Sequence, residues 1–290
     1  MTGNSQNMGC PMNQLPEYGK HTPLTYNAYL RVKELKLLQQ CQSEHHDEPL
    51  FIIIHQTYEL WFKLILHEID QVMVLLAADQ VRRSRFFLNR VVEIFKVLVD
   101  QIHVLETMNP VDFLGFRSKL NPASGFQSSQ FREIEIACGL TDKMLLEHFR
   151  QDVSFEDLTR RAEAPSLRQA FNDLLRRRGF VLPEPPPTET PLTPEQEEQA
   201  NKFEEQRLQE LRKIWEKTDE YGDLHDLAET LIDIDEQLTL WRTHHVTVVE
   251  RVIGFKRGTG GSEGVGYLRT TVHKRCFPDL WKVRTVLELA

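Results

Sequence analysis

The pattern between residues 223 and 253 constrains the fold of this chain more than any other feature. Its stripe positions are spaced alternately three and four residues apart: Leu224, Leu227, Leu231, Ile234, Leu238, Trp241, His245, Val248 and Val252. This spacing is typical of a long helix that buries one face. One stripe position differs from the rest, because His245 places an imidazole among apolar side chains.

Helical periodicity also covers residues 50–79 and 81–108, and the short polar hinge between them predicts an antiparallel pair. A shorter amphipathic helix is expected over 25–40, and a charged outer helix over 194–221. Strand signals are nearly absent, so we predict an all-α fold. We expect a flexible lead-in over residues 1–22 and one domain over 23–290, with a proline-rich connection at about 182–194 inside it.

Residues 109–128 interrupt the helical pattern with two Asn-Pro pairs and two glycines. These prolines and glycines predict an ordered turn region rather than a helix. Three phenylalanines, Phe113, Phe116 and Phe126, would anchor it against the rest of the protein.

Composition excludes several classes of protein. The formal net charge of -8 argues against nucleic acid or an anionic membrane as the partner. No run of 18 apolar residues occurs, so no membrane-spanning helix is expected. The N-terminus lacks the basic and then apolar order of a secretory signal. The four cysteines are widely separated without a CxxC pair, which argues against a zinc site and suits a reducing cytoplasm.

Two histidines and an arginine are candidates for chemistry. His245 must be hydrogen-bonded or must bind something, and a lone buried histidine is more often a core residue satisfied by a neighbour. No carboxylate or second histidine follows on its stripe, which disfavours a di-metal site but permits single-histidine haem ligation. His55 lies among isoleucines and aromatic residues, where it is either structural or an acid, base or acceptor. Arg117 requires an anion, from Asp112 or from a substrate carboxylate.

The segment KRGTGGSEGVG, residues 256–266, follows the long helix. Its spacing is neither that of a P-loop nor that of a Rossmann turn. Its backbone N–H groups and the hydroxyl of Thr259 could instead hold a small polar ligand, and its glycines suit a loop that closes over a site.

Three segments together resemble the signature regions of the tryptophan 2,3-dioxygenase family: FIIIHQTYELWFKLILHEID, LETMNPVDFLGFRSKLNPASGFQSSQFR and LWRTHHVTVVERVIGFKRGTGGSEGVGYLR. The resemblance runs from about Leu24 to about Val286. It implies a cytosolic, helical, haem-dependent homotetramer, built as a dimer of dimers. It also implies an enzyme that inserts O2 across the indole C2–C3 bond of L-tryptophan to give N-formylkynurenine, the first step of the kynurenine pathway.

The resemblance implies a role for each matching residue. His245 would be the axial ligand of a haem b iron, one per subunit, and His55 would contact the indole N–H. Arg117 would pair with the substrate carboxylate, and Thr259 would contact the amino-acid end. The indole pocket would have three hydrophobic walls, Phe51, Phe113 and Leu120. Tyr26 and Tyr29 resemble residues of an N-terminal arm that reaches a neighbouring subunit's site.

Two positions depart from the family pattern. Phe113 stands where many members have tyrosine, and Glu263 stands where serine is usual in the glycine loop. The added charge at Glu263 bears on loop dynamics and fine specificity. Three alternatives remain from the sequence: an oxygenase of a modified indole or another aromatic amino acid, a helical haem or ligand sensor without turnover, and a scaffold without cofactor.

Overall fold

The computed structural model describes residues 24–183, 193–256, 258 and 264–288, apart from the side chains of residues 143–145. Every regular element within these ranges is a helix, and the described residues contain no strand. The predicted all-α fold is therefore confirmed. The chain divides into two compact units, Met1–Gln40 and Cys41–Ala290.

The described part of the first unit holds two short helices, α1 (Tyr26–Tyr29) and α2 (Val32–Leu35). The hydroxyl of Thr25 caps α1 by accepting a hydrogen bond from the N–H of Ala28 (3.3 Å). Arg31 separates the helices with a left-handed backbone (φ +51°). The single helix expected over 25–40 is thus broken in two.

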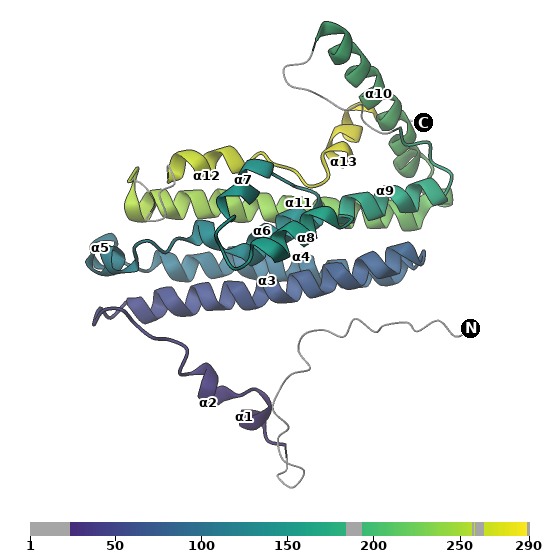
Figure 1. Cartoon of the computed structure of the whole chain (residues 1–290). Helices are drawn as coiled ribbons and strands as arrows, with labels where there is room; N and C mark the ends of the chain where they lie inside the picture. The colour runs from purple at the N-terminus through teal and green to yellow at the C-terminus, as the bar shows by residue number, and fades with distance from the viewer. Residues whose placement is uncertain (1–23, 184–192, 257, 259–263, 289–290) are drawn as a thin grey trace. The chain divides into compact units, whose positions relative to one another are not determined.

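Three long helices form the body of the second unit: α3 (Glu48–Ala77), α4 (Val81–Glu106) and α11 (Thr218–Ile253). They lie side by side, with α4 packed against both α3 and α11 (Figure 1). The turn between α3 and α4 passes through Asp79 (φ +58°), whose carboxylate accepts two-pronged hydrogen bonds from Arg178. The pairing predicted for residues 50–79 and 81–108 is confirmed.

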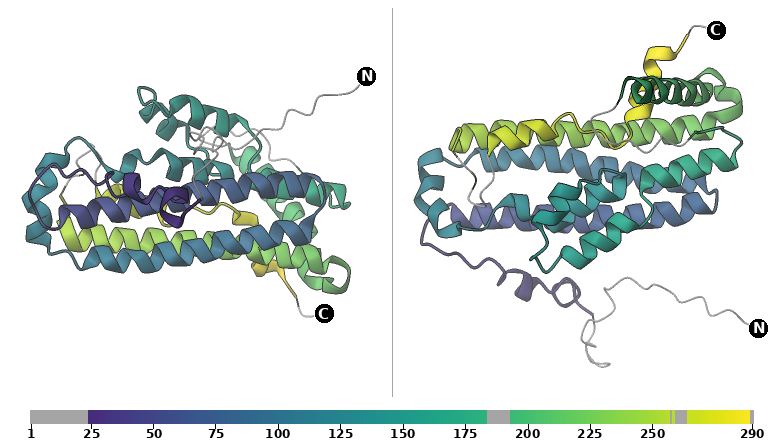
Figure 2. Two further views of the ribbon diagram at one scale, coloured as in Figure 1. Left: turned by 90° about the horizontal axis from the view of Figure 1, so that it is seen from below. Right: turned by 45° about the horizontal axis from the view of Figure 1, so that its top comes forward.

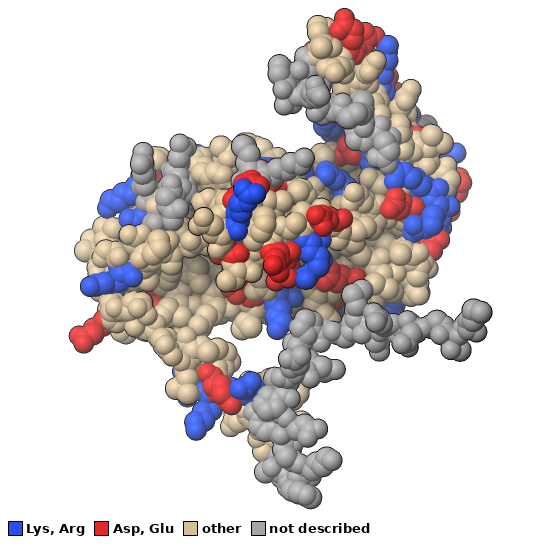
Figure 3. Space-filling view, viewed as in Figure 1, with Lys and Arg blue, Asp and Glu red and all other residues tan. Residues whose placement is uncertain are grey.

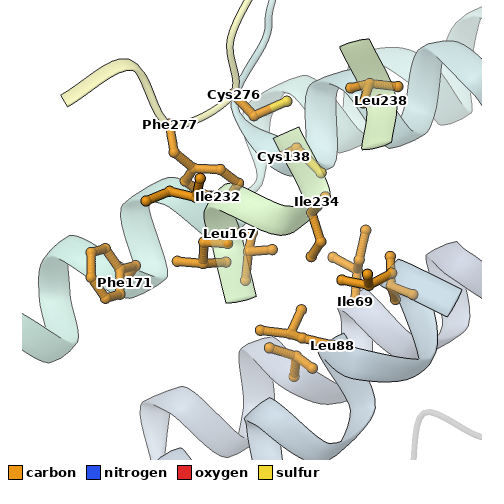
Figure 4. Close-up of a cluster of buried hydrophobic side chains, with 14 of the residues drawn as sticks. Ile69, Leu88, Cys138, Leu167, Phe171, Ile232, Ile234, Leu238, Cys276 and Phe277 are labelled. Carbon is orange, nitrogen blue, oxygen red and sulfur yellow. The ribbon is translucent and has the colours of Figure 1, made fainter. Parts of the chain in front are cut away.

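The core lies where smaller helices cover this layer. Figure 4 shows Ile69 of α3, Leu88 of α4 and Ile234 of α11 converging with side chains from α6 (Ser129–Cys138) and α9 (Leu167–Arg177). All three are almost completely inaccessible to solvent. Burial of this kind contributes about 1.5–3 kcal/mol for each large apolar side chain, which makes the three-helix layer a rigid support for a site at its end.

The region predicted as turns over 109–128 contains a helix, α5 (Pro110–Arg117), so that prediction was wrong there. Asn109 caps α5 by accepting a hydrogen bond from the N–H of Val111 (2.9 Å), and Pro110 is its first residue. Both are helix-start features that resemble turn signals in sequence. Short 3-10 turns follow at Ser118–Leu120 and Gly125–Gln127.

The remaining helices lie around this body and are visible from two further directions in Figure 2. They are α7 (Lys143–His148), α8 (Phe155–Glu163), α10 (Pro194–Glu216), α12 (Val265–Thr271) and α13 (Pro278–Lys282), followed by a 3-10 turn at Val283–Val286. Acidic and basic side chains are intermixed on the face shown in Figure 3. No described helix is long and apolar enough to cross a bilayer.

Candidate functional site

One end of the second unit is lined by aromatic rings. Phe113 and Phe116 of α5 pack edge to face (5.3 Å between ring centroids), and Phe51 of α3 lies 5.6 Å from Phe113 and 5.9 Å from Phe116. The apolar neighbours come from several elements: Leu50, Leu105, Leu120, Val252 and Ile253. The start of α3, the end of α4, α5 and the end of α11 therefore meet here, as Figure 1 also shows.

His55 lies one helical turn after Phe51, and the two rings are 4.1 Å apart. Its Nδ1 is 2.7 Å from the carbonyl oxygen of Phe51. A carbonyl oxygen can only accept, so Nδ1 carries the proton and Nε2 of the neutral ring keeps a lone pair. Burial lowers the pKa of His55, while the Phe51 hydrogen bond and the charge of Glu59 oppose the shift. The neutral ring is therefore the form present near pH 7, with an acceptor at Nε2.

Glu59 connects α3 to the segment that begins α6. Its Oε1 accepts a hydrogen bond from the hydroxyl of Ser128 (2.6 Å), and its Oε2 accepts one from Nε2 of Gln130 (2.8 Å). Gln130 also donates to the backbone carbonyl of Glu59 (3.0 Å). Ser128 in turn caps α6. The carboxylate that lies one turn from His55 thus holds the serine- and glutamine-rich segment beside it.

His245 projects from α11 near the same site. The pKa of His245 is lowered to about 4, first by burial and then by electrostatic repulsion from His55 and Arg132. No hydrogen bond to the imidazole opposes this shift among the described residues. The side chain nevertheless keeps some accessible surface. A neutral, half-buried imidazole with an uncommitted lone pair can serve as a ligand to a metal.

Trp241 stacks on His245, with 5.1 Å between ring centroids and 21° between planes. Other aromatic rings surround the indole: Tyr58 at 6.2 Å, Phe62 at 6.4 Å and Phe131 at 4.8 Å. Its Nε1 is buried and has no hydrogen-bond partner in the described part of the chain. This aromatic cage restricts how the imidazole of His245 can rotate.

A buried ion network lies behind His245. Glu135 accepts hydrogen bonds from Arg132 and Arg242, each at 2.6 Å, and all three side chains are nearly inaccessible. Arg242 also donates to the carbonyl oxygen of Lys274 (2.9 Å). Two guanidinium groups share one carboxylate, which leaves a net positive charge inside the protein. That charge disfavours protonation of His245.

The helices on either side of the glycine loop are linked by an ion pair. Arg269 of α12 donates to both carboxylate oxygens of Glu250 on α11 (3.1 and 2.9 Å). Gly264 has φ +64°, and a Cβ at this position would lie 2.6 Å from the carbonyl oxygen of Lys256. Thr259 and Glu263, two residues singled out in the sequence, lie outside the described residues.

The structure brings several predicted site residues together. Phe51, Phe113 and Leu120 share the aromatic cluster, His55 contacts Phe51, and His245 lies within electrostatic range of His55. Arg117 is the last residue of α5 and is half-buried. His244, on another face of α11, instead has its ring 5.6 Å from that of His103. Tyr26 and Tyr29 belong to α1 of the other unit, where both are exposed.

The residues around His245 fit a haem. In the described ranges no three histidine, cysteine, aspartate or glutamate side chains form a cluster that could hold a metal ion. An iron bound by His245 would therefore need most of its ligands from a macrocycle. Aromatic and aliphatic surroundings and an uncommitted imidazole nitrogen suit such a group.

Sequence patterns missed two contributors to this site. Trp241 was assigned only to the buried stripe, although its position one turn before His245 is a signal for stacking. The Arg132–Glu135–Arg242 network gave no sequence signal, because Glu135 and Arg242 are 107 residues apart.

Comparisons with known proteins agree with this arrangement. The sequence model described as "Tryptophan 2,3-dioxygenase" matches residues 13–183 and 194–287. A tryptophan 2,3-dioxygenase of Herpetosiphon aurantiacus is 43% identical over 270 residues, covering 91% of this chain and 98% of that protein. Those of Xanthomonas campestris pv. campestris and Xanthomonas euvesicatoria pv. vesicatoria are 41% and 42% identical over 282 residues, covering 93% of this chain and 91% of each protein. The chain therefore belongs to the tryptophan 2,3-dioxygenase family.

Proposed function

We propose that this protein inserts both atoms of O2 across the indole C2–C3 bond of L-tryptophan, giving N-formylkynurenine. The reaction is the first step of tryptophan degradation by the kynurenine pathway. One observation supports the proposal above the others. His55 presents an unprotonated Nε2 in a phenylalanine-lined site within electrostatic range of His245. An indole needs this combination of an apolar pocket and one acceptor for its N–H.

The cofactor in this proposal is haem b, one per subunit, with His245 as the axial ligand of its iron. The haem supplies the site at which O2 binds and is activated. His245 is neutral at pH 7, because its pKa is lowered to about 4, mainly by burial. The imidazole therefore does not have to lose a proton before it binds iron. Trp241 holds the imidazole plane by stacking on it.

His55 orients the indole rather than removing its proton. The pKa of His55 is lowered, which makes the ring a weak base. Its Nε2 accepts a hydrogen bond from the indole N–H, while the Phe51 carbonyl holds the proton at Nδ1. The rings of Phe51 and Phe113, with Leu120, enclose the indole and exclude water. Placing the two reacting carbons in one orientation is the contribution expected of such a pocket.

The amino-acid end of the substrate requires polar partners. Arg117, at the end of the helix that carries Phe113, can pair with the carboxylate through two parallel hydrogen bonds. Thr259 and its neighbouring glycines are assigned to the same end by the family resemblance. Together they would select an α-amino acid over a plain indole.

We further propose that the protein is a homotetramer, a dimer of dimers, that acts in the cytoplasm. The exposed rings of α1 support this proposal, since Tyr26 and Tyr29 are 76% and 70% exposed in a single chain. Large apolar residues at this exposure are typical of an interaction surface. In the assembly both tyrosines would contribute to a neighbouring subunit's site.

The test is an optical spectrum and a turnover assay on purified holoprotein. We expect a Soret band that changes on addition of L-tryptophan to the ferrous protein, and a product with near-ultraviolet absorbance under air. Haem-loaded protein that binds but never consumes L-tryptophan would contradict the proposal and favour a sensor. A preference for a substituted indole in a substrate panel would redirect it to a related oxygenase.

A further inference from the structure

We propose that His45 is a positioning residue: its ring packs against the backbone of α5 at Gly115 and thereby determines where α5 holds Phe113 and Arg117. This inference rests on the proposed function, because it concerns the amino-acid end of the substrate. It makes His45 a determinant of specificity that contacts no substrate itself.

A buried carboxylate anchors the segment that carries His45. Glu48, the first residue of α3, is completely inaccessible and accepts hydrogen bonds from the backbone N–H groups of Gln42 (2.6 Å) and Ser43 (2.8 Å). It also accepts one from the Ser43 hydroxyl. Burial alone would raise the pKa of Glu48, but these hydrogen bonds lower it below its ordinary value. The carboxylate is therefore ionised, and it ties residues 42 and 43 to the start of α3.

His45 is held between these anchored residues. Its N–H donates to the Ser43 hydroxyl oxygen (3.2 Å), and its carbonyl oxygen accepts from the N–H of Glu48 (3.2 Å). The backbone on both sides of the ring is thus connected to Glu48, on one side through Ser43 and the Glu48 carboxylate and on the other through the Glu48 N–H. Such a turn presents its side chain in one direction.

The ring meets α5 where the helix has no side chain. A Cβ at Gly115 would lie 2.7 Å from Nε2 of His45 and 2.8 Å from its Cδ2, so any other residue here would displace the ring or the helix. The neighbouring Phe116 ring is 5.6 Å away. Nδ1 of His45 is buried without a hydrogen-bond partner in the described residues. The contact is therefore one of van der Waals packing, in which the flat imidazole lies against the backbone of Gly115.

Helical geometry gives this contact its consequence. Phe113 and Arg117 are each two residues from Gly115, which places both about 200° around the helix from it. They are four residues apart and share one face. His45 therefore presses on the side of α5 opposite the two substrate residues. Because α5 has only eight residues, a shift at this contact moves both side chains together.

The substrate carboxylate is the group most sensitive to such a shift. A two-pronged guanidinium–carboxylate pair requires a defined angle and distance, whereas the indole is held by non-directional apolar contacts. A displacement of about 1 Å can reduce a rate by roughly a hundredfold when it affects the bound geometry. Loss of the His45 contact should therefore weaken binding of L-tryptophan more than binding of an indole that lacks a carboxylate.

The experiment compares two ligands in the holoprotein. Binding of L-tryptophan and of tryptamine, which lacks the carboxylate, is measured from the haem absorption of His45→Ala, Gly115→Ala and the double variant, with KM and kcat for L-tryptophan. The matched control is His46→Ala, because His46 is the exposed neighbour of His45. The double variant addresses folding, since removal of the ring makes room for the added methyl group.

We expect His45→Ala to weaken binding of L-tryptophan on the order of tenfold, while the affinity for tryptamine changes less than about twofold. For L-tryptophan, KM should rise by a larger factor than kcat falls. Gly115→Ala should do the same, and the double variant should lose less than the product of the single effects. An effect no larger than that of His46→Ala, or equal losses for both ligands, would overturn the inference. Wild-type turnover of L-tryptophan is measured alongside, so failure of this inference remains distinct from failure of the proposed function.

Discussion

The indole of Trp241 and the imidazole of His245 are stacked one turn apart on α11, with centroids separated by 5.1 Å and planes inclined by 21°. The stack places a flat aromatic surface beside the residue assigned to the haem iron. Three further rings enclose the indole and hold it in place, so the stack restricts rotation of the imidazole. The direction of its lone pair is thus set by packing rather than by a hydrogen bond.

Removal of the Trp241 ring should lower both the free energy of unfolding and the retention of haem. We expect Trp241→Ala to lower the free energy of unfolding by about 3–5 kcal/mol, through lost burial and an unfilled cavity. Trp241→Phe keeps a flat ring and removes an indole N–H that has no partner in the described residues, so its loss should be clearly smaller. Urea unfolding gives the stability, and transfer of haem to an acceptor globin gives retention. Equal haem loss from both variants would contradict a role for the stack.

The two site histidines should make the haem-free protein sensitive to acid. Burial lowers the pKa of His245 from an ordinary 6.5 to about 4, and it lowers the pKa of His55 as well. Below about pH 6.5 the unfolded chain takes up protons at these positions that the folded chain does not. The free energy of unfolding should therefore fall as the pH drops from about 6.5 toward 4. Urea midpoints across that range measure it.

His245→Gln provides the control for this pH dependence. It removes one of the two histidines that resist protonation, so the decline in stability with acid should become shallower. Haem-bound wild type should show a decline at least as steep, because an imidazole bound to iron in the folded protein takes up no proton either. A haem-free variant with an unchanged slope would exclude His245 as a source of the acid sensitivity.

The buried carboxylate of Glu135 should contribute far more to the free energy of unfolding than the carboxylate of Glu133 on the same helix. Glu135→Gln leaves Arg132 and Arg242 without a compensating charge and should lower the free energy of unfolding by about 3–5 kcal/mol. Glu133, two residues earlier, has its pKa raised first by burial, with Arg161 opposing. Glu133→Gln should therefore be nearly neutral. Chemical unfolding of both variants measures the contrast, and similar losses would show that the network is not the cause.

Asp235 should hold the segment between α12 and α13 onto α11. Its carboxylate accepts hydrogen bonds from the N–H groups of Cys276 (2.7 Å) and Phe277 (2.8 Å) and from Nε1 of Trp281 (3.2 Å). Asp235→Asn retains one acceptor oxygen, and each donor left unpaired costs about 1–3 kcal/mol. We expect faster amide exchange over residues 274–281 by mass spectrometry. Asp233→Asn, at an exposed position of the same helix, should leave exchange unchanged.

Much of the fold could be predicted because its determinants are local. The alternating stripe in residues 223–253 predicted α11, and the helical periodicity of residues 50–79 predicted α3. The error at α5 has a local cause as well. Asn109 and Pro110 form a helix start, yet the same dipeptide is common in turns, and Gly115 is unfavourable within a helix. The close approach of His45 explains why glycine is needed there.

The site likewise contains residues that sequence motifs identify and contacts that they do not. Family motifs identified His55, His245 and Arg117, and their assigned roles stay predictions. Contacts between distant segments were invisible in sequence, as with Glu135 and Arg242 or with His45 and Gly115. Periodicity indicates which face of a helix is buried, but it does not indicate which residue lies opposite. For this reason no sequence pattern pointed to His45.

The contact between Lys256 and Gly264 also bears on how such proteins can diversify. Where the two ends of a loop touch, the intervening chain can gain or lose residues without moving the helices on either side. The entropy of closing a longer loop rises only with the logarithm of its length, about 0.6 kcal/mol for each doubling. Insertions and deletions between these residues are therefore expected to cost little stability while α11 and α12 stay in place.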